Sequence, residues 1–232
     1  MSEPDRGRRR KSHDAEGTRE ALLNAAETIF AEHGFDGARV DAIATLAGCN
    51  KSLIFQYFGD KLNLYVEVIR RADREMSAVQ NRLLASLHTD ASAAFDPERF
   101  KDTLAIIVGT LFDYLVEHPR LIRMLSWEQA EGWETYTKTF AQFETDDNEQ
   151  FATLFRAASE AGFLRSDLSA LFQVTIALQV SLSYLSWKPL YEIVFPHEDF
   201  SSGPARARLR EYIVNFIIAG ICNASREPGR SP

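Results

Sequence analysis

The chain has 232 residues, of which 45% are hydrophobic and 25% charged, and its formal net charge is -7 at pH 7. This hydrophobic content is enough to bury a core, which excludes a chain that is disordered throughout. The acidic balance argues against a protein whose whole surface binds nucleic acid, because such domains usually carry a basic excess. Any contact with DNA therefore has to be local.

The N-terminus and the cysteines point to a reducing compartment. Cys49 and Cys222 lie far apart in the sequence, and residues 1–17, "MSEPDRGRRRKSHDAEG", contain no apolar segment like that of a secretory leader. We therefore expect a cytoplasmic protein. Residues 1–17 are Arg-rich and aperiodic, which predicts a flexible basic tail. The basic segment "RGRRRK", residues 6–11, could follow DNA as basic arms do, or simply be solvated.

The first predicted helix lies in "TREALLNAAETIFAEHGF", with Thr18 placed as its N-cap. Gly34 followed by apolar Phe35 predicts its end, because glycine readily adopts the left-handed conformation found just after a helix. The same device recurs at Gly162 and Phe163. The residues at helical spacing are Leu22, Ala26, Ile29, Phe30 and His33.

Residues 40–58 carry the spacing of a helix-turn-helix. It needs a small residue where the two helices cross, a glycine where the turn requires positive φ, and a branched residue that anchors the second helix. The second helix, about 51–57, would present its N-terminal residues to a DNA major groove, which is wide enough for one helix. Positions one, five, nine and fifteen of the pattern are Val40, Ala44, Gly48 and Ile54.

Helices are predicted for the rest of the chain as well. Asp60 is placed to cap a long helix, and Asp96 with Pro97 begins another that ends before Pro119. The short apolar run at 191–195 lies in a connection that contains Pro and Gly. The fold class is therefore all-α. Further helices are expected at 119–131, 134–161, 167–187 and 205–224.

One uncharged segment is long enough to be considered as a membrane span. Residues 168–187 contain no charge over 20 positions, a length that could span a bilayer. Gln173, Gln179, four serines and a threonine make the segment a poor membrane span. We favour a helix that is buried on more than one side.

The segments "AEHGFDGARV" and "IATLAGCNKSLIFQYFGDKLNLYVEVI" carry a family pattern. Ile43-Ala44 matches the Ile-Ala of this pattern, and Ala47-Gly48-Cys49-Asn50 matches its Ala-Gly-hydrophobic-Ser. Further along, Leu-Tyr-x-x-Phe is matched by Ile54-Phe55-Gln56-Tyr57-Phe58, and x-x-Lys-x-x-Leu by Lys61 with Leu64. About 50 residues match in order. This part of the chain resembles the DNA-binding domain of the tetracycline-repressor-like (TetR) family of bacterial regulators. The remainder resembles the family in its helices and in His118-Pro119 at the start of the sixth helix.

The resemblance implies an N-terminal three-helix DNA-binding domain with a helix-turn-helix, followed by a larger helical ligand-binding and dimerisation domain. We assign residues 18–64 to the first, 65–225 to the second, and 226–232 to a C-terminal tail. A homodimer is expected through the helices at 167–187 and 205–224. Both helices have apolar residues around too much of their circumference to pack in one core alone, so one face is expected to pack inside the monomer and another against the second copy. The alternative is that both faces are buried within a larger monomer.

The resemblance also places DNA contacts on the helix-turn-helix. Gln56 can pair bidentately with adenine and Lys51 can donate to guanine. Tyr57, Lys61 and Arg39 are expected to hold phosphates, which fixes the domain on the duplex. A merely solvated face is the alternative. The predicted contact residues are Arg39, Asn50, Lys51, Ser52, Phe55, Gln56, Tyr57 and Lys61.

Three of these residues depart from the family pattern. Arg39 stands where the family usually has threonine, and it could reach a phosphate. Asn50 replaces the common Ser or Thr at the start of the second helix but keeps an N-cap acceptor. Phe55 stands where the family usually has tyrosine, so it lacks a phenol hydroxyl for a phosphate.

In the family, the second domain encloses an effector pocket whose occupation moves the two DNA-binding domains apart. We predict that Trp127, Tyr136, Gln173 and Tyr184 line such a pocket, because each combines an apolar body with a polar group. Ordinary core packing is the alternative. The expected effector is small and largely apolar, and the sequence does not identify it.

We therefore predict a ligand-responsive transcriptional regulator: a repressor that binds a palindromic operator as a homodimer and is released by its effector. An activator is the other possibility, because the position of the operator relative to a promoter decides whether binding represses or activates transcription. No phosphate loop, GxSxG, HExxH or CxxC motif is present, so we expect no catalysis, cofactor or metal, and "HED" at 197–199 is interpreted as a solvated turn. The alternative is a helical dimer of the same fold that acts by protein or ligand binding without operator recognition.

Overall fold

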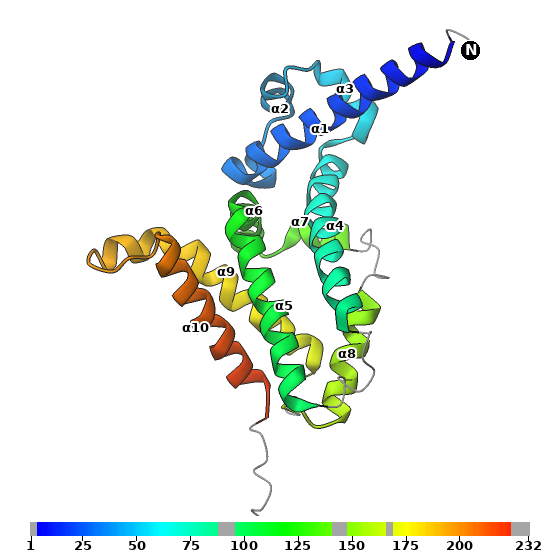
Figure 1. Cartoon of the computed structure of the whole chain (residues 1–232). Coiled ribbons are helices and arrows are strands. Elements are labelled where there is room, and N and C mark those ends of the chain that lie inside the picture. Colours follow the sequence, from blue (N-terminus) through cyan, green and yellow to red (C-terminus); the bar gives the residue numbers. More distant parts are fainter. Residues whose placement is uncertain (1–3, 88–95, 141–147, 166–168, 224–232) are drawn as a thin grey trace, which may run out of the picture. The chain divides into compact units, whose positions relative to one another are not determined.

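The computed structural model describes residues 4–87, 96–140, 148–165 and 169–223 (Figure 1). Within these ranges the regular structure is helical, and the only β feature is an isolated antiparallel bridge between Leu164 and Cys222. The prediction of an all-α chain is confirmed. By packing, the chain divides into a first unit, Met1–Arg74 with Pro119–Phe143, and a second unit, Glu75–His118 with Glu144–Pro232.

The first unit gathers the N-terminal helices around one core. It contains α1 (Pro4–Gly37), α2 (Val40–Leu46), α3 (Lys51–Phe58), the start of α4 (Lys61–Leu87), α6 (Pro119–Ala130) and α7 (Glu134–Phe140). α1 packs against both α2 and α6, and α2 packs against α3. The first core includes the buried residues Leu22, Phe30, Ile43, Ile54, Tyr65 and Met124. By packing, α6 and α7 thus join the helix-turn-helix, although they lie beyond the predicted boundary at residue 64.

α1 begins earlier than predicted. It starts at Pro4, so Thr18 lies inside the helix and the predicted cap is wrong. The basic segment consists mainly of Arg and Lys, which have high helix propensity, and proline is favoured at a first helical position. The glycine stop is confirmed within these bounds: Gly34 has a φ of 68° and interrupts the helical backbone, and a short separate turn follows it up to Gly37. Phe35 then folds back on Phe30, with 6.2 Å between ring centroids.

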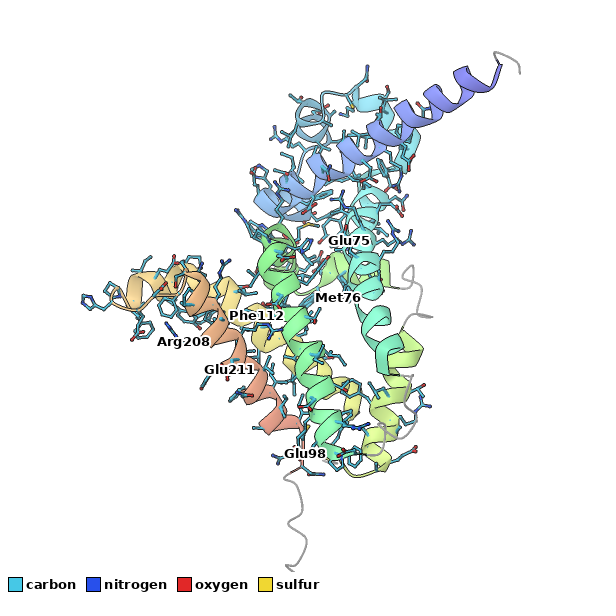
Figure 2. The ribbon with its side chains drawn as sticks, viewed as in Figure 1. Glu75, Met76, Glu98, Phe112, Arg208 and Glu211 are labelled. Atoms are coloured by element: carbon cyan, nitrogen blue, oxygen red, sulfur yellow. The ribbon has the colours of Figure 1, made fainter. Side chains whose placement is uncertain are left out.

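The second unit contains the rest of α4, α5 (Pro97–Glu117), α8 (Asn148–Glu160), α9 (Ala170–Val194) and α10 (Gly203–Ile221). α5 packs against α9 and α10, and α8 packs against α9. The predicted start of α5 is confirmed, because the Asp96 carboxylate accepts the Glu98 N–H at 3.1 Å and Pro97 is the first helical residue. Phe112 of α5 (Figure 2) is buried in a second core with Phe100, Leu104, Phe155, Ile213 and Ile217.

α9 is longer than predicted. It continues beyond residue 187, through Pro189, to Val194, so the run at 191–195 is largely helical and not part of a connection. Tyr191 lies 6.4 Å from both Trp187 and Phe195 between ring centroids, and this spacing of four residues suits a helix face. In the part of the chain that the structure describes, no helix combines the length and apolar character that a membrane span requires.

The other predicted helices match with shifted ends. α10 occupies the segment predicted at 205–224. The helix predicted at 134–161 corresponds to α7 and α8, and residues 141–147 between them lie outside the described ranges. Gly162 has a φ of 75°, so the second predicted glycine stop is confirmed.

Candidate nucleic-acid interface

α2 and α3 form the predicted helix-turn-helix. Gly48, in the turn, has a φ of 64°, and the N–H of Cys49 donates to the Ala44 carbonyl at 2.9 Å. The Asn50 side chain accepts the N–H of Ser52 at 2.9 Å and thereby caps α3. Local hydrogen bonds thus fix the turn and the start of α3, which orients the residues that follow.

α3 buries one face and exposes the other. Ile54 and Phe58 are buried in the first core, and Leu53 and Tyr57 are partly buried against it. Positions 51, 52, 55 and 56 share one face of a helix with 3.6 residues per turn. We call this exposed set the α3 strip: Lys51, Ser52, Phe55 and Gln56. The structure therefore brings four of the eight predicted contact residues onto one surface.

Two members of the α3 strip already have partners within the protein. Lys51 Nζ lies 2.9 Å from Asp41 Oδ1, which joins α3 to the first turn of α2. The Ser52 hydroxyl donates to Asn50 Oδ1 at 3.0 Å. The sequence prediction missed the pair of Lys51 with Asp41. The acidic residue near the start of α2 was an available signal, but the pairing depends on how the two helices cross.

Lys61 lies at the start of α4 and contacts the end of α1. Its ammonium is 4.6 Å from the centroid of the Phe35 ring and donates to the Asp36 carbonyl at 3.3 Å. Burial lowers the pKa of Lys61, and the negative charges of Asp36 and Glu131 oppose this shift. Arg39, another predicted phosphate contact, is exposed and precedes α2 without a side-chain cap. Lys61 therefore has a local positioning role that Arg39 lacks.

A buried carboxylate connects three helices of the first unit. Glu128 of α6 is only 1% exposed. It accepts the Tyr65 hydroxyl of α4 at 2.6 Å and the backbone N–H of Tyr136 of α7 at 3.0 Å. Burial and the hydrogen bond to Glu128 raise the pKa of Tyr65 well above its ordinary value. The sequence prediction missed Glu128, because nothing in the local pattern distinguishes it from a surface glutamate.

The four predicted effector residues are not gathered within either unit. In the first unit, Trp127 Nε1 donates to the Ala31 carbonyl at 3.3 Å, and Tyr136 packs against the first core. Tyr184 belongs to the second unit, and the side chain of Gln173 lies outside the described residues. Each unit by itself thus holds only part of the set, and the pocket stays a prediction.

α9 and α10 border a groove of about 450 Å³ in the second unit. The hydroxyl of Tyr184 is buried and has no hydrogen-bond partner within the described ranges. Burial also raises the pKa of Tyr184. The lining residues that the structure describes are uncharged: Ile176, Gln179, Val180, Ser183, Tyr184, Tyr191, Leu209, Tyr212, Ile213 and Phe216.

Large apolar side chains crowd the exposed surface on the same two helices. We call this surface the α9–α10 face: Phe172, Ile176, Trp187, Leu190, Ile193, Val194, Tyr212 and Phe216. The rings of Tyr212 and Phe216 stack with 6.5 Å between centroids. The exposed charges Arg208 and Glu211 lie on α10 (Figure 2). Single exposed apolar residues are common on proteins, whereas an extended apolar surface is typical of an interface.

Known proteins resemble both parts of the chain. Residues 22–68 match the family model described as bacterial regulatory proteins, tetR family, and residues 101–217 match the model described as tetracyclin repressor-like, C-terminal domain. Among curated relatives, the HTH-type transcriptional repressor NicS of Pseudomonas putida is 34% identical over 118 residues, 51% of each chain. The HTH-type transcriptional repressor SCO4008 of Streptomyces coelicolor is 33% identical over 120 residues, 52% of this chain and 54% of the relative. The matches thus span about half the length of these relatives.

Solved structures share the fold over most of the chain. A putative transcriptional regulator, SCO4942 from Streptomyces coelicolor, has a TM-score of 0.57 at 24% identity and covers 88% of this chain and 98% of its own. A putative tetR family regulator from Shewanella sp. PV-4 has a TM-score of 0.62 at 14% identity, with coverages of 89% and 99%. At these identities the structures establish the fold alone. With both family models matched in order, the chain belongs to the tetR family of bacterial regulatory proteins.

Proposed function

We propose that the protein is a ligand-responsive, DNA-binding transcriptional regulator in the cytoplasm. It binds a palindromic operator as a homodimer, acts as a repressor, and is released by a small, largely apolar effector. The observation that carries this proposal is the α3 strip, an exposed helix face held on a capped helix-turn-helix in a member of the tetR family. A helix of this width fits the major groove of DNA.

The α3 strip supplies the base contacts in this proposal. Gln56 is exposed and can pair bidentately with adenine. Lys51 can donate to guanine once DNA competes with Asp41 for its ammonium. Arg39 and the half-buried Tyr57 hold phosphates, and Asn50 keeps α3 in place by capping it. Lys61 adds a positive charge near the backbone while it positions α4 against α1.

The α9–α10 face supplies the homodimer contact. A single short recognition helix reads only a few base pairs, and a two-fold dimer presents two of them about 34 Å apart, or at a multiple of that distance. The face is rich in aromatic side chains, which dominate binding at interfaces. A second copy would also cover the groove that Tyr184 helps to line. Arg208 and Glu211 place charge of both signs on α10.

Release by the effector is a shift between two dimer states. One state holds the α3 helices at the operator spacing, and the effector favours another spacing. The effector can act only through its different affinities for the two states. α4 contributes residues to both units, so we propose that it transmits the change between them.

Two substitutions test the division between base and phosphate contacts on a DNA duplex selected from a random pool. Gln56→Ala is expected to relax discrimination at one position per half-site by about 1–3 kcal/mol. Arg39→Ala is expected to weaken binding to all sequences alike and to reduce the slope of log K against log salt by about one per half-site. Titrations at several salt concentrations measure both effects. Equal loss for every sequence in both variants would contradict this division.

A further inference from the structure

The α3 strip contains one residue that cannot form hydrogen bonds through its side chain. Phe55 is 48% exposed, whereas Ile54 and Phe58 on the same helix are buried. Phe55 belongs neither to the first core nor to the partly buried residues that pack against it. The first unit therefore does not need the Phe55 ring to complete its core.

The neighbours of Phe55 place its ring on the surface that the proposed function assigns to base reading. Ser52 lies one turn before it on the same face, and Gln56 follows it directly. The fold thus holds an apolar ring on the surface that the proposed function turns toward the major groove. Because a phenyl ring has no donor or acceptor, it cannot hold a phosphate oxygen or read the hydrogen-bonding edge of a base.

The major groove offers one apolar group to such a ring, the 5-methyl group of thymine. Contact with this methyl group removes apolar surface of both partners from water. Contact with a cytosine or guanine edge instead removes water from polar atoms without replacing their hydrogen bonds. We propose that Phe55 determines sequence specificity by packing its ring against the 5-methyl group of a thymine, in the same half-site as the base that Gln56 reads. This assignment rests on the proposed function.

Deoxyuridine provides a direct test, because it removes the methyl group and keeps every hydrogen-bonding atom of thymine. Each thymine of the selected operator is replaced in turn, at symmetric positions of both half-sites, and affinity is measured for the wild-type protein. We expect one thymine position at which the replacement weakens binding about fourfold per half-site, the effect of exposing one methyl-sized group. Phe55→Ala is expected to bind the thymine and deoxyuridine duplexes equally.

Leu46→Ala is the matched control, because Leu46 is a similarly exposed apolar residue on α2, at 54%. This variant should keep the preference for thymine. Circular dichroism and thermal unfolding of each variant verify that the helix-turn-helix is folded. Phe55→Tyr keeps the ring and should also keep the preference.

The outcomes separate the assignment from the function on which it rests. If no duplex is enriched over random DNA, the proposed function fails and this assignment fails with it. If an operator is bound but no deoxyuridine replacement weakens binding, the assignment alone is wrong. It is also wrong if Phe55→Ala retains the preference for the methylated base.

Discussion

The two units of the molecule differ in where their exposed apolar residues lie. In the first unit the exposed large apolar residues among those described are Leu46, Phe55 and Trp127, which lie on three different helices, α2, α3 and α6. In the second unit they crowd the α9–α10 face. A unit that closes its core with its own helices can present polar atoms to DNA. A unit that leaves one helical face uncovered is suited to a second chain.

The largest expected effect comes from placing a charge on the α9–α10 face. Phe216 is 57% exposed, so Phe216→Asp should leave the fold intact while it buries a carboxylate in the proposed dimer interface. Because a two-fold interface contains every substitution twice, we expect the dimer dissociation constant to rise by at least about 100-fold. Sedimentation velocity over a range of concentrations measures this change.

The matched control uses an apolar residue of similar exposure on another helix of the same unit. Ile106 of α5 is 50% exposed, and Ile106→Asp should not alter the dimer dissociation constant. An unchanged constant in Phe216→Asp, or an equal rise in both variants, would remove the contrast between the two units.

The second-largest expected effect is a loss of stability when a buried hydrogen bond of the first unit is removed. Tyr65→Phe removes the hydroxyl that donates to the buried Glu128 carboxylate. A buried acceptor that loses a donor costs about 1–3 kcal/mol, so we expect the free energy of unfolding to fall by that amount. Denaturant titration measures it. Tyr57→Phe, at a half-buried position of α3, should change stability by less than about 0.5 kcal/mol. Equal losses in the two variants would show that Glu128 does not depend on Tyr65.

Features set by neighbouring residues could be predicted from the sequence, whereas contacts between distant residues could not. The helix-turn-helix could be predicted because its determinants are local: a glycine in the turn, an asparagine cap and two buried anchors in sequence register. The bond between Tyr65 and Glu128 spans 63 positions and depends on how α6 packs against α4. The extension of α9 through Pro189 was missed because an interior proline usually kinks or ends a helix. Here the helix continues to Val194, and the Tyr191 ring lies near those of Trp187 and Phe195.

The smallest expected effect lies in the turn before α10, where "HED" was interpreted as solvated. Asp199 is exposed, and its Oδ1 accepts the N–H groups of Ser201 at 3.0 Å and Ser202 at 2.9 Å. Hydrogen bonds from Ser202 and Ser201 lower the pKa of Asp199 to about 2. Across the described ranges, no three His, Cys, Asp or Glu side chains cluster as a metal site requires. The turn is thus a capping structure that involves a carboxylate.

This lowered pKa fixes the direction of a small pH dependence. The unfolded chain protonates Asp199 near pH 4, whereas the folded chain keeps it ionised to about pH 2. The contribution of the turn to stability is therefore complete above about pH 4 and is lost as the pH falls toward 2. Carbon-detected NMR titration of the carboxyl group should show its midpoint near pH 2. A midpoint near 4 would mean that the serine N–H groups do not bind it in solution.

Selection of bound duplexes from a random DNA pool, with the mass of the resulting complex measured in parallel, tests the central claim most directly. We predict an inverted repeat that binds two copies of the chain, with half-site centres separated by one helical turn or a multiple of it. Recovery of nothing beyond a salt-sensitive background, or of a single half-site bound by one chain, would contradict the proposal that the two units together build a dimeric reader of operator DNA.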